Sequence, residues 1–129
     1  MKKTYNFLKK CTVFYVATAE NNIPHLRPFG AVEIWQDKLI VQTGKAKDVF
    51  HQIMSNPKIE IVACDGENWL RLHCIAEFVE DEAAESVFYA EYPYLEETYD
   101  EGNPMAIFAL TKATASFFYA DGSSDSTNF

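Results

Sequence analysis

Apolar and polar residues alternate along much of the chain, and this pattern predicts a mainly β protein. The alternation is clearest from Trp69 to Glu80, where Leu70, Leu72 and the even positions up to residue 78 are apolar. Side chains of a strand point alternately to its two faces, so one face of this strand is expected to be buried. β-branched and aromatic residues predict five more strands, over 11–19, 23–35, 38–43, 58–64 and 105–120, the last being one strand or a bent pair.

Turn sequences separate the predicted strands and keep the links between them short. Gln36-Asp37 is a two-residue turn, and residues 65–68 contain the Asp, Gly and Asn that turns favour. Pro24 and Pro28 lie inside the second segment. Because proline has no backbone N–H, that segment must be an edge strand or be irregular there. Short links between successive strands favour antiparallel pairing.

Helical spacing replaces the alternation in two stretches. Apolar residues between positions 46 and 54 recur at i, i+3 and i+4, and Asn56-Pro57 ends this helix. The predicted buried face comprises Ala46, Val49, Phe50, Ile53 and Met54. A second helix follows Asp81, a residue type that caps helices, and is expected to bury Ala83, Ala84, Val87 and Phe88. Shorter helical segments are expected over 3–10 and within 92–103.

These elements predict a single domain over residues 1–129, with a polar tail at 121–129. About six strands joined by short links, with a few helices, favour a small antiparallel β-barrel. A chain of this length is within the usual size of one domain and can bury a core. Hydrophobic residues make up 48% of the sequence, which is typical of a globular protein rather than a disordered one.

Charge is distributed unevenly along the chain. The net charge is −8, yet residues 1–76 carry a net +3, while residues 77–101, the acidic segment, hold ten acids and no base. A net acidic chain of this kind is a poor nucleic-acid binder, because phosphate neutralisation needs a contiguous basic surface. The few bases can still converge on one small anion. The acidic segment is expected to lie at the surface, away from any bound phosphate.

The sequence predicts a cytoplasmic protein with no membrane partner and no metal site. No apolar run reaches the roughly 20 residues of a membrane span, and no long apolar region follows the basic start as in a signal peptide. Cys11, Cys64 and Cys74 form no C-x-x-C pair, and the three histidines add no zinc spacing. No nucleophile or acid–base pair occurs at a recognisable spacing, so no catalytic side chain is expected.

The most informative window for chemistry is residues 43–47, Thr-Gly-Lys-Ala-Lys, between a predicted strand end and a helix start. A helix N-terminus attracts phosphate, Gly44 permits close backbone approach, and Thr43, Lys45 and Lys47 supply a hydroxyl and two charges. The alternative is a solvated link with two surface lysines. Arg27 lies one predicted strand away and offers a planar fork of donors, unless a nearby acid pairs with it.

A later strand places Trp69 and Arg71 on one face, either near a ligand or as an ordinary cross-strand pair. The order of all these motifs resembles the pyridoxamine 5′-phosphate oxidase-like FMN-binding split-barrel family, most of all its short bacterial branch of nitroimidazole-resistance-type proteins. The motifs are R-P-F-G at 27–30, T-G-K-x-K at 43–47, N-P at 56–57 and W-L-R-L-x-C at 69–74. The resemblance extends over about residues 5–119 and is strongest across 27–57.

The resemblance implies a six-stranded antiparallel Greek-key split β-barrel that forms a homodimer and holds FMN at the subunit interface. Matched positions lie on the strand along the flavin, at the strand end and helix start around its phosphate, and on a later strand that can approach it. The cofactor-binding residues implied in this way are Arg27, Pro28, Phe29, Thr43, Gly44, Lys45, Lys47, Trp69 and Arg71.

The activity that the resemblance implies is an FMN-dependent oxidoreductase acting on a small-molecule substrate, with NADH or NADPH as a candidate reductant. Two alternatives stay open: a module that stores or senses flavin without turnover, and a split barrel that uses haem or a deazaflavin instead. Pyridoxamine phosphate oxidases end in a basic, His-containing segment, whereas residues 121–129 contain no such bases. Oxidation of vitamin B6 is therefore not expected.

Overall fold

The computed structural model describes residues 1–129 as four helices and eight strands. The helices are α1 (Lys2–Cys11), α2 (Asp48–Ser55), α3 (Glu82–Glu91) and α4 (Leu95–Thr98). The strands are β1 (Phe14–Glu20), β2 (Ile23–Phe29), β3 (Val32–Trp35), β4 (Lys38–Gly44), β5 (Lys58–Cys64), β6 (Trp69–Val79), β7 (Met105–Phe118) and β8 (Ser124–Asn128). The predicted mainly β class is therefore confirmed.

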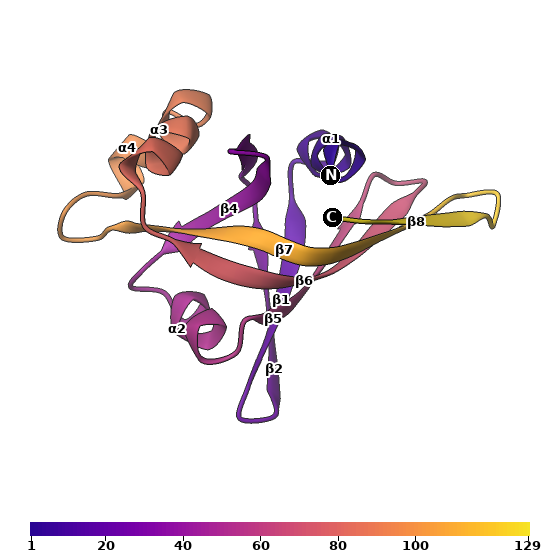
Figure 1. Ribbon diagram of the computed structural model, residues 1–129, viewed down its shortest axis with the longest axis horizontal. Helices are drawn as coiled ribbons and strands as arrows, with labels where there is room; N and C mark the ends of the chain where they lie inside the picture. Colours follow the sequence, from indigo (N-terminus) through magenta and orange to yellow (C-terminus); the bar gives the residue numbers. More distant parts are fainter.

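All neighbouring strands pair antiparallel, in the order β2-β1-β5-β6-β7-β4-β3, with β8 added to β7. The long strands β6 and β7 cross the middle of the molecule, and the β1–β2 hairpin projects from it (Figure 1). The helices lie at three separate places around the sheet: α1 at one, α2 at another, and α3 together with α4 at the third (Figure 1). The result is the antiparallel barrel architecture that the sequence predicts.

The structure has eight strands where the sequence predicts six, and both additions have a local cause. The predicted segment 23–35 is interrupted at Gly30 and Ala31, which separate β2 from β3. The predicted polar tail forms β8, in which Asn128 pairs with Thr114 on β7. An edge strand needs only backbone hydrogen bonds to one neighbour, so the polar side chains of β8 can remain largely exposed.

The apolar face predicted for β6 lies in the main core. Leu70 and Leu72 are fully buried there, together with Phe117 of β7. A second cluster joins the other part of the sheet to α3, through Phe88 and Ile107. The Asp81 cap is also confirmed, because its carboxylate accepts a hydrogen bond from the backbone N–H of Ala83 at 2.8 Å. Of the residues expected to be buried in this helix, Ala84 and Phe88 are buried and Ala83 is exposed.

The face predicted for α2 is only partly correct. Val49 and Ile53 are buried, but Met54 is 52% exposed and Ala46 precedes the helix. Gln52 is buried in their place because its side-chain oxygen accepts hydrogen bonds from Thr18 and an arginine of β2. The helix therefore buries a polar side chain that has hydrogen-bond partners, and Met54 of the predicted apolar face lies in solvent instead.

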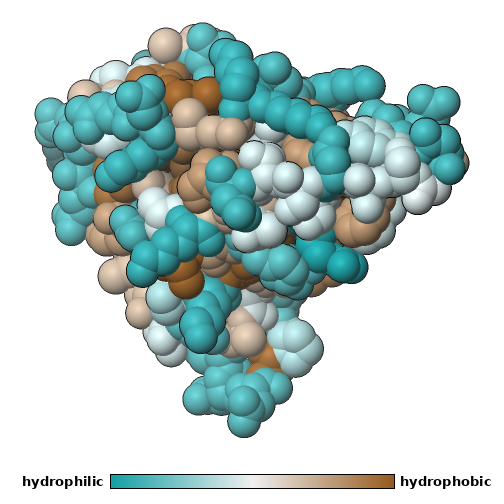
Figure 2. Space-filling view, turned by 45° about the vertical axis from the view of Figure 1, so that its right-hand side comes forward, coloured by the Kyte–Doolittle hydropathy of each residue, from teal (hydrophilic) through white to brown (hydrophobic).

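No helix of the molecule is long and apolar enough to cross a membrane. The acids of the acidic segment, residues 77–101, point mainly to solvent, whereas Leu95 and Tyr99 from the same segment are buried. In the space-filling view, apolar residues emerge in separate patches among hydrophilic ones (Figure 2).

Candidate functional site

A cavity of about 150 Å³ lies between β2, the end of β4, the start of α2 and the acidic segment. β2 and β4 stand near opposite ends of the strand order, so curvature of the sheet brings them to this cavity. Its lining residues are Arg27, Pro28, Phe29, Gly30, Gln42, Thr43, Lys47, Val49 and Tyr99. Five residues predicted from the sequence as cofactor-binding therefore share one cavity, namely Arg27, Pro28, Phe29, Thr43 and Lys47.

Arg27 lies on the inward face of β2, where it alternates with the exposed Leu26 and Pro28. Its guanidinium donates to the backbone oxygen of Val16 at 3.2 Å, to the hydroxyl of Thr18 at 2.8 Å and to the side-chain oxygen of Gln52. These acceptors are neutral, and no salt bridge joins Arg27 to a carboxylate. Burial lowers the pKa of Arg27, and the Asp48 charge opposes this. A partly buried cation without an ion-pair partner favours a bound anion.

Thr43, Gly44 and Lys47 form the corner where β4 gives way to α2. Thr43 is buried, and Lys47 is the N-cap residue of α2. A Cβ atom at Gly44 would lie 3.1 Å from Cε1 of Tyr99, so the small residue allows the tyrosine ring to pack against the strand. The backbone N–H groups at the start of α2 carry a partial positive charge. This corner therefore combines a hydroxyl, an ammonium group and a helix N-terminus.

Gln42 adds an unsatisfied acceptor to the same cavity. Its side-chain oxygen is buried and has no hydrogen-bond partner. A buried acceptor of this kind costs free energy unless a donor reaches it. Because Gln42 lines the cavity, a ligand that presents an N–H group would supply that donor. The donors and the one free acceptor of the cavity therefore fit a ligand that has an anionic end and a ring with an N–H group.

Lys45 points to a different cavity from Lys47. The chain turns at residues 45 and 46, and the backbone N–H of Lys45 donates to the oxygen of Pro104 at 3.0 Å. Its ammonium group lies 5.4 Å from the centre of the Phe78 ring, in a cavity of about 240 Å³ walled by acids that include Glu80 and Glu82. The two lysines of the T-G-K-x-K motif are therefore not brought together.

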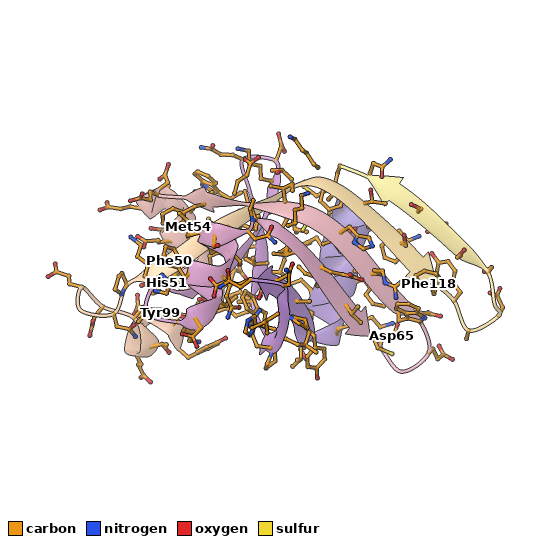
Figure 3. All side chains as sticks on the ribbon, turned by 90° about the horizontal axis from the view of Figure 1, so that it is seen from below. Phe50, His51, Met54, Asp65, Tyr99 and Phe118 are labelled. Carbon is orange, nitrogen blue, oxygen red and sulfur yellow. The ribbon has the colours of Figure 1, made fainter.

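Trp69 and Arg71 lie on the outward face of the sheet, opposite to the face of Arg27. Trp69 stacks on Phe118 with ring centres 4.2 Å apart, and Arg71 pairs with Glu60 at 2.9 Å. Phe118 lies at the far end of the molecule from Tyr99 (Figure 3). Arg71 is separated from Pro28 by the strand partners Tyr15 and Val62, about 14 Å at the usual strand spacing. Within one chain, neither residue reaches the cavity.

Four lining residues were not among the predicted cofactor-binding residues, namely Gly30, Gln42, Val49 and Tyr99, and two of these, Gln42 and Tyr99, bring new polar groups. Gln42 follows the apolar run Leu39 to Val41 in β4, and that position is the only signal of a special role. Tyr99 belongs to the acidic segment that was expected to lie away from the phosphate. This expectation is wrong for Tyr99, which is 6% exposed and lines the cavity beside Thr43. Burial raises the pKa of its phenol, so the ring stays neutral.

Comparisons with known proteins agree with the fold. The family model described as pyridoxamine 5′-phosphate oxidase matches residues 1–119. The structure is similar to that of a NimC/NimA family protein from Clostridium acetobutylicum, with 31% identity and a TM-score of 0.94 over 100% of this chain and 92% of the other. The comparison with curated proteins finds no match.

More distant solved structures share the fold. A putative pyridoxamine 5′-phosphate oxidase from Listeria innocua is 17% identical, with a TM-score of 0.68 over 85% of this chain and 90% of the other. HutZ, the haem storage protein from Vibrio cholerae, is 12% identical, with a TM-score of 0.66 over 84% of this chain and 87% of its own. This architecture therefore occurs in proteins named for different ligands.

Proposed function

The chain belongs to the pyridoxamine 5′-phosphate oxidase family, and from that premise we propose that it binds FMN in the cavity between β2 and β4 and works as an FMN-dependent oxidoreductase. One observation carries the proposal. Arg27 and Lys47, neither of them in a salt bridge, line a single cavity together with Gln42, whose side-chain oxygen has no hydrogen-bond partner.

The phosphate of FMN fits the corner between β4 and α2. Lys47 and the N-terminus of α2 offer positive charge, and the hydroxyl of Thr43 offers a further donor. Arg27 on β2, across the cavity from β4, adds the guanidinium donors that Val16, Thr18 and Gln52 leave unused, and these three residues hold the side chain in place. Such a preorganised set binds an anion without first ordering its own side chains.

The flavin ring fits the apolar and aromatic part of the lining. Pro28, Phe29 and Tyr99 provide flat surfaces, and the Gln42 oxygen can accept a ring N–H. FMN supplies the hydride or electron transfer when bound. The residues of this chain bind and orient it and exclude water from one side. A small-molecule substrate and NADH or NADPH are its proposed reaction partners.

A second copy of the chain completes the proposed site. The cavity of about 150 Å³ is smaller than the roughly 300–1,000 Å³ of ligand pockets, so one chain encloses only part of FMN. The outward face of β1 and β2 exposes Tyr15 by 47% and Leu26 by 69%. Trp69 and Arg71 lie on the same side of the sheet. Pro28 lines the cavity and also lies on this outward face, so a homodimer through this face would cover the open edge of the cavity.

Haem is the alternative that the distant neighbour HutZ raises. Proteins ligate haem iron through His, Cys, Met or Tyr side chains. The cavity contains no His, Cys or Met, and its one tyrosine, Tyr99, is buried against Gly44. This lining favours FMN over haem. A flavin-storing module without turnover would use the same residues and differs only in its reactivity.

The test is the visible absorption spectrum of the purified protein after equilibration with FMN and, separately, with haemin. We expect a flavin spectrum that stays with the protein through gel filtration, and bleaching of that spectrum when NADH or NADPH is added without oxygen. A flavin spectrum that neither reductant bleaches would favour the storage module. A protein that retains haemin but no FMN would contradict the proposal.

A further inference from the structure

A second cavity, of about 310 Å³, lies between the end of α1, the start of β3 and the loop after α3. α1 and α3 stand on either side of β4 in Figure 1, and the cavity lies in this part of the molecule. Its lining residues are Leu8, Lys9, Thr12, Gly30, Val32, Tyr92 and Tyr94. Gly30 also lines the proposed FMN cavity, so the two cavities adjoin at this residue.

The walls of the second cavity suit a flat apolar ring. Leu8 and Val32 are buried behind it. The rings of Tyr92 and Tyr94 lie edge to face, with centres 6.2 Å apart, and Tyr94 is 55% exposed at the mouth. An exposed tyrosine ring beside a cavity offers an aromatic surface on which a planar ligand can pack.

Lys9 gives the cavity one directed polar group. Its ammonium group donates to the carboxylate of Glu33 at 2.6 Å and to the hydroxyl of Tyr92 at 3.0 Å. Burial lowers the pKa of Lys9, but the hydrogen bonds to Glu33 and Tyr92 outweigh it and raise the pKa above its usual value. The lysine therefore stays protonated, and an ammonium group has three N–H donors. Two have partners and the third is free for a ligand.

The charge around Lys9 is already balanced. Glu33 is buried, pairs with Lys9 and also accepts a hydrogen bond from Tyr5 at 3.0 Å. A ligand at the third N–H therefore meets a neutral ion pair rather than a free cation. The acidic segment, to which Tyr92 and Tyr94 belong, adds negative charge nearby. Both features favour a neutral acceptor over an anion.

We propose that this second cavity binds a neutral, planar aromatic compound that carries a carbonyl oxygen, with the ring against Tyr92 and Tyr94 and the oxygen accepting from Lys9. That such a compound lies beside a bound flavin rests on the proposed function, because Gly30 lines both cavities and sets the two ligands side by side. The binding itself does not require flavin.

Three matched probes test this specificity by NMR titration of the protein with and without FMN. Benzamide has the ring, the carbonyl and no charge; benzoate replaces the amide by an anion; cyclohexanecarboxamide replaces the flat ring. We expect benzamide to bind at least tenfold more tightly than either of the others. Equal binding of benzoate or of cyclohexanecarboxamide would overturn the proposal, as would no binding of benzamide.

Two variants locate the binding. Tyr94→Ala removes a wall that makes no side-chain hydrogen bond and should weaken benzamide about fivefold, whereas Met54→Ala, a change at an exposed residue of α2, should leave it unchanged. Lys9→Met alone would strand the buried Glu33 carboxylate, so it is paired with Glu33→Gln. The double variant should weaken benzamide roughly tenfold. Unchanged binding in both variants would overturn the assignment.

The two proposals fail separately. Tyr94 and Lys9 do not line the FMN cavity, so FMN affinity should be the same in these variants as in the natural protein. Uptake of FMN without binding of benzamide would contradict only the second cavity's role. Binding of benzamide by a protein that takes up no FMN would contradict only the proposed function.

Discussion

Arg27 donates only to neutral groups, on Val16, Thr18 and Gln52, and it faces a cavity rather than a carboxylate. The alternation along β2 places Arg27 on the same face as Phe29, and the burial of Phe29 shows that this face is inward. The bond to Gln52 was not predictable, because it depends on the angle at which α2 packs on β1. At the scale of single residues, sequence periodicity gave the direction of a side chain but not its partners.

Lys45 and Lys47 provide a matched pair of variants. Only Lys47 lines the cavity, so Lys47→Ala should weaken FMN binding by roughly 10- to 100-fold, the loss of one charge-assisted hydrogen bond to phosphate. Lys45→Ala removes the same charge two residues away and should change affinity less than threefold. Fluorescence titration of FMN at low salt measures both. Similar losses in the two variants would indicate a diffuse charge effect instead of a phosphate site.

Gly44 and Gly30 allow a comparable test of packing. A methyl group at Gly44 would lie 3.1 Å from the buried Tyr99 ring, so Gly44→Ala should lower the free energy of unfolding by about 1 kcal/mol. Gly30→Ala meets only the Thr12 backbone oxygen at 3.7 Å and should leave that energy nearly unchanged. Urea unfolding of the two variants measures the difference. A Gly44→Ala variant as stable as the natural protein would show that Tyr99 moves freely.

At the scale of elements, β5 was predicted with its observed bounds, and β6 nearly so, because strong alternation and flanking turns mark both. Pro24 and Pro28 predicted an edge strand, and β2 is one, but no such signal predicted the break at Gly30 and Ala31 between β2 and β3. β8 was missed because its side chains are polar and only backbone hydrogen bonds to β7 hold it. Hydrophobic periodicity predicts elements that bury one face, and it does not predict elements such as β8 that bury neither.

The turn between β5 and β6 predicts a pH dependence of stability. Asp65 accepts hydrogen bonds from the backbone N–H groups of Asn68 and Glu67 and from Lys10, which lower its pKa to about 2. Because the pKa is depressed in the folded state, this contribution is present above the unfolded value of about 4 and is lost as the pH falls towards 2.

Asp65→Asn should therefore be less stable than the natural protein at pH 6, and the difference should shrink steadily between pH 4 and pH 2. Urea unfolding at pH 6, 4 and 2.5 measures it. A difference that stays constant over this range would show that the carboxylate charge does not stabilise the turn.

At the scale of the whole molecule, the small volume of the cavity leads us to expect that a dimer completes the proposed FMN site. Sedimentation at micromolar concentration should give about twice 14.7 kDa. Leu26→Asp places a charge on the outward face of β2 and should yield monomers that bind FMN at least tenfold more weakly. Met54→Asp alters another exposed apolar residue, on α2, and should leave the dimer intact (Figure 3). A natural protein that is monomeric with FMN bound would contradict the shared site.

The most direct measurement is the ratio of the dissociation constants of FMN and riboflavin, two ligands that share a ring and differ by one phosphate. The corner formed by Arg27, Thr43, Lys47 and the start of α2 predicts that FMN binds at least tenfold more tightly, and that the advantage falls as salt rises. Arg27→Met should remove most of this advantage. Equal affinities for the two flavins, or no uptake of either at several hundred micromolar, would contradict an FMN site in this cavity.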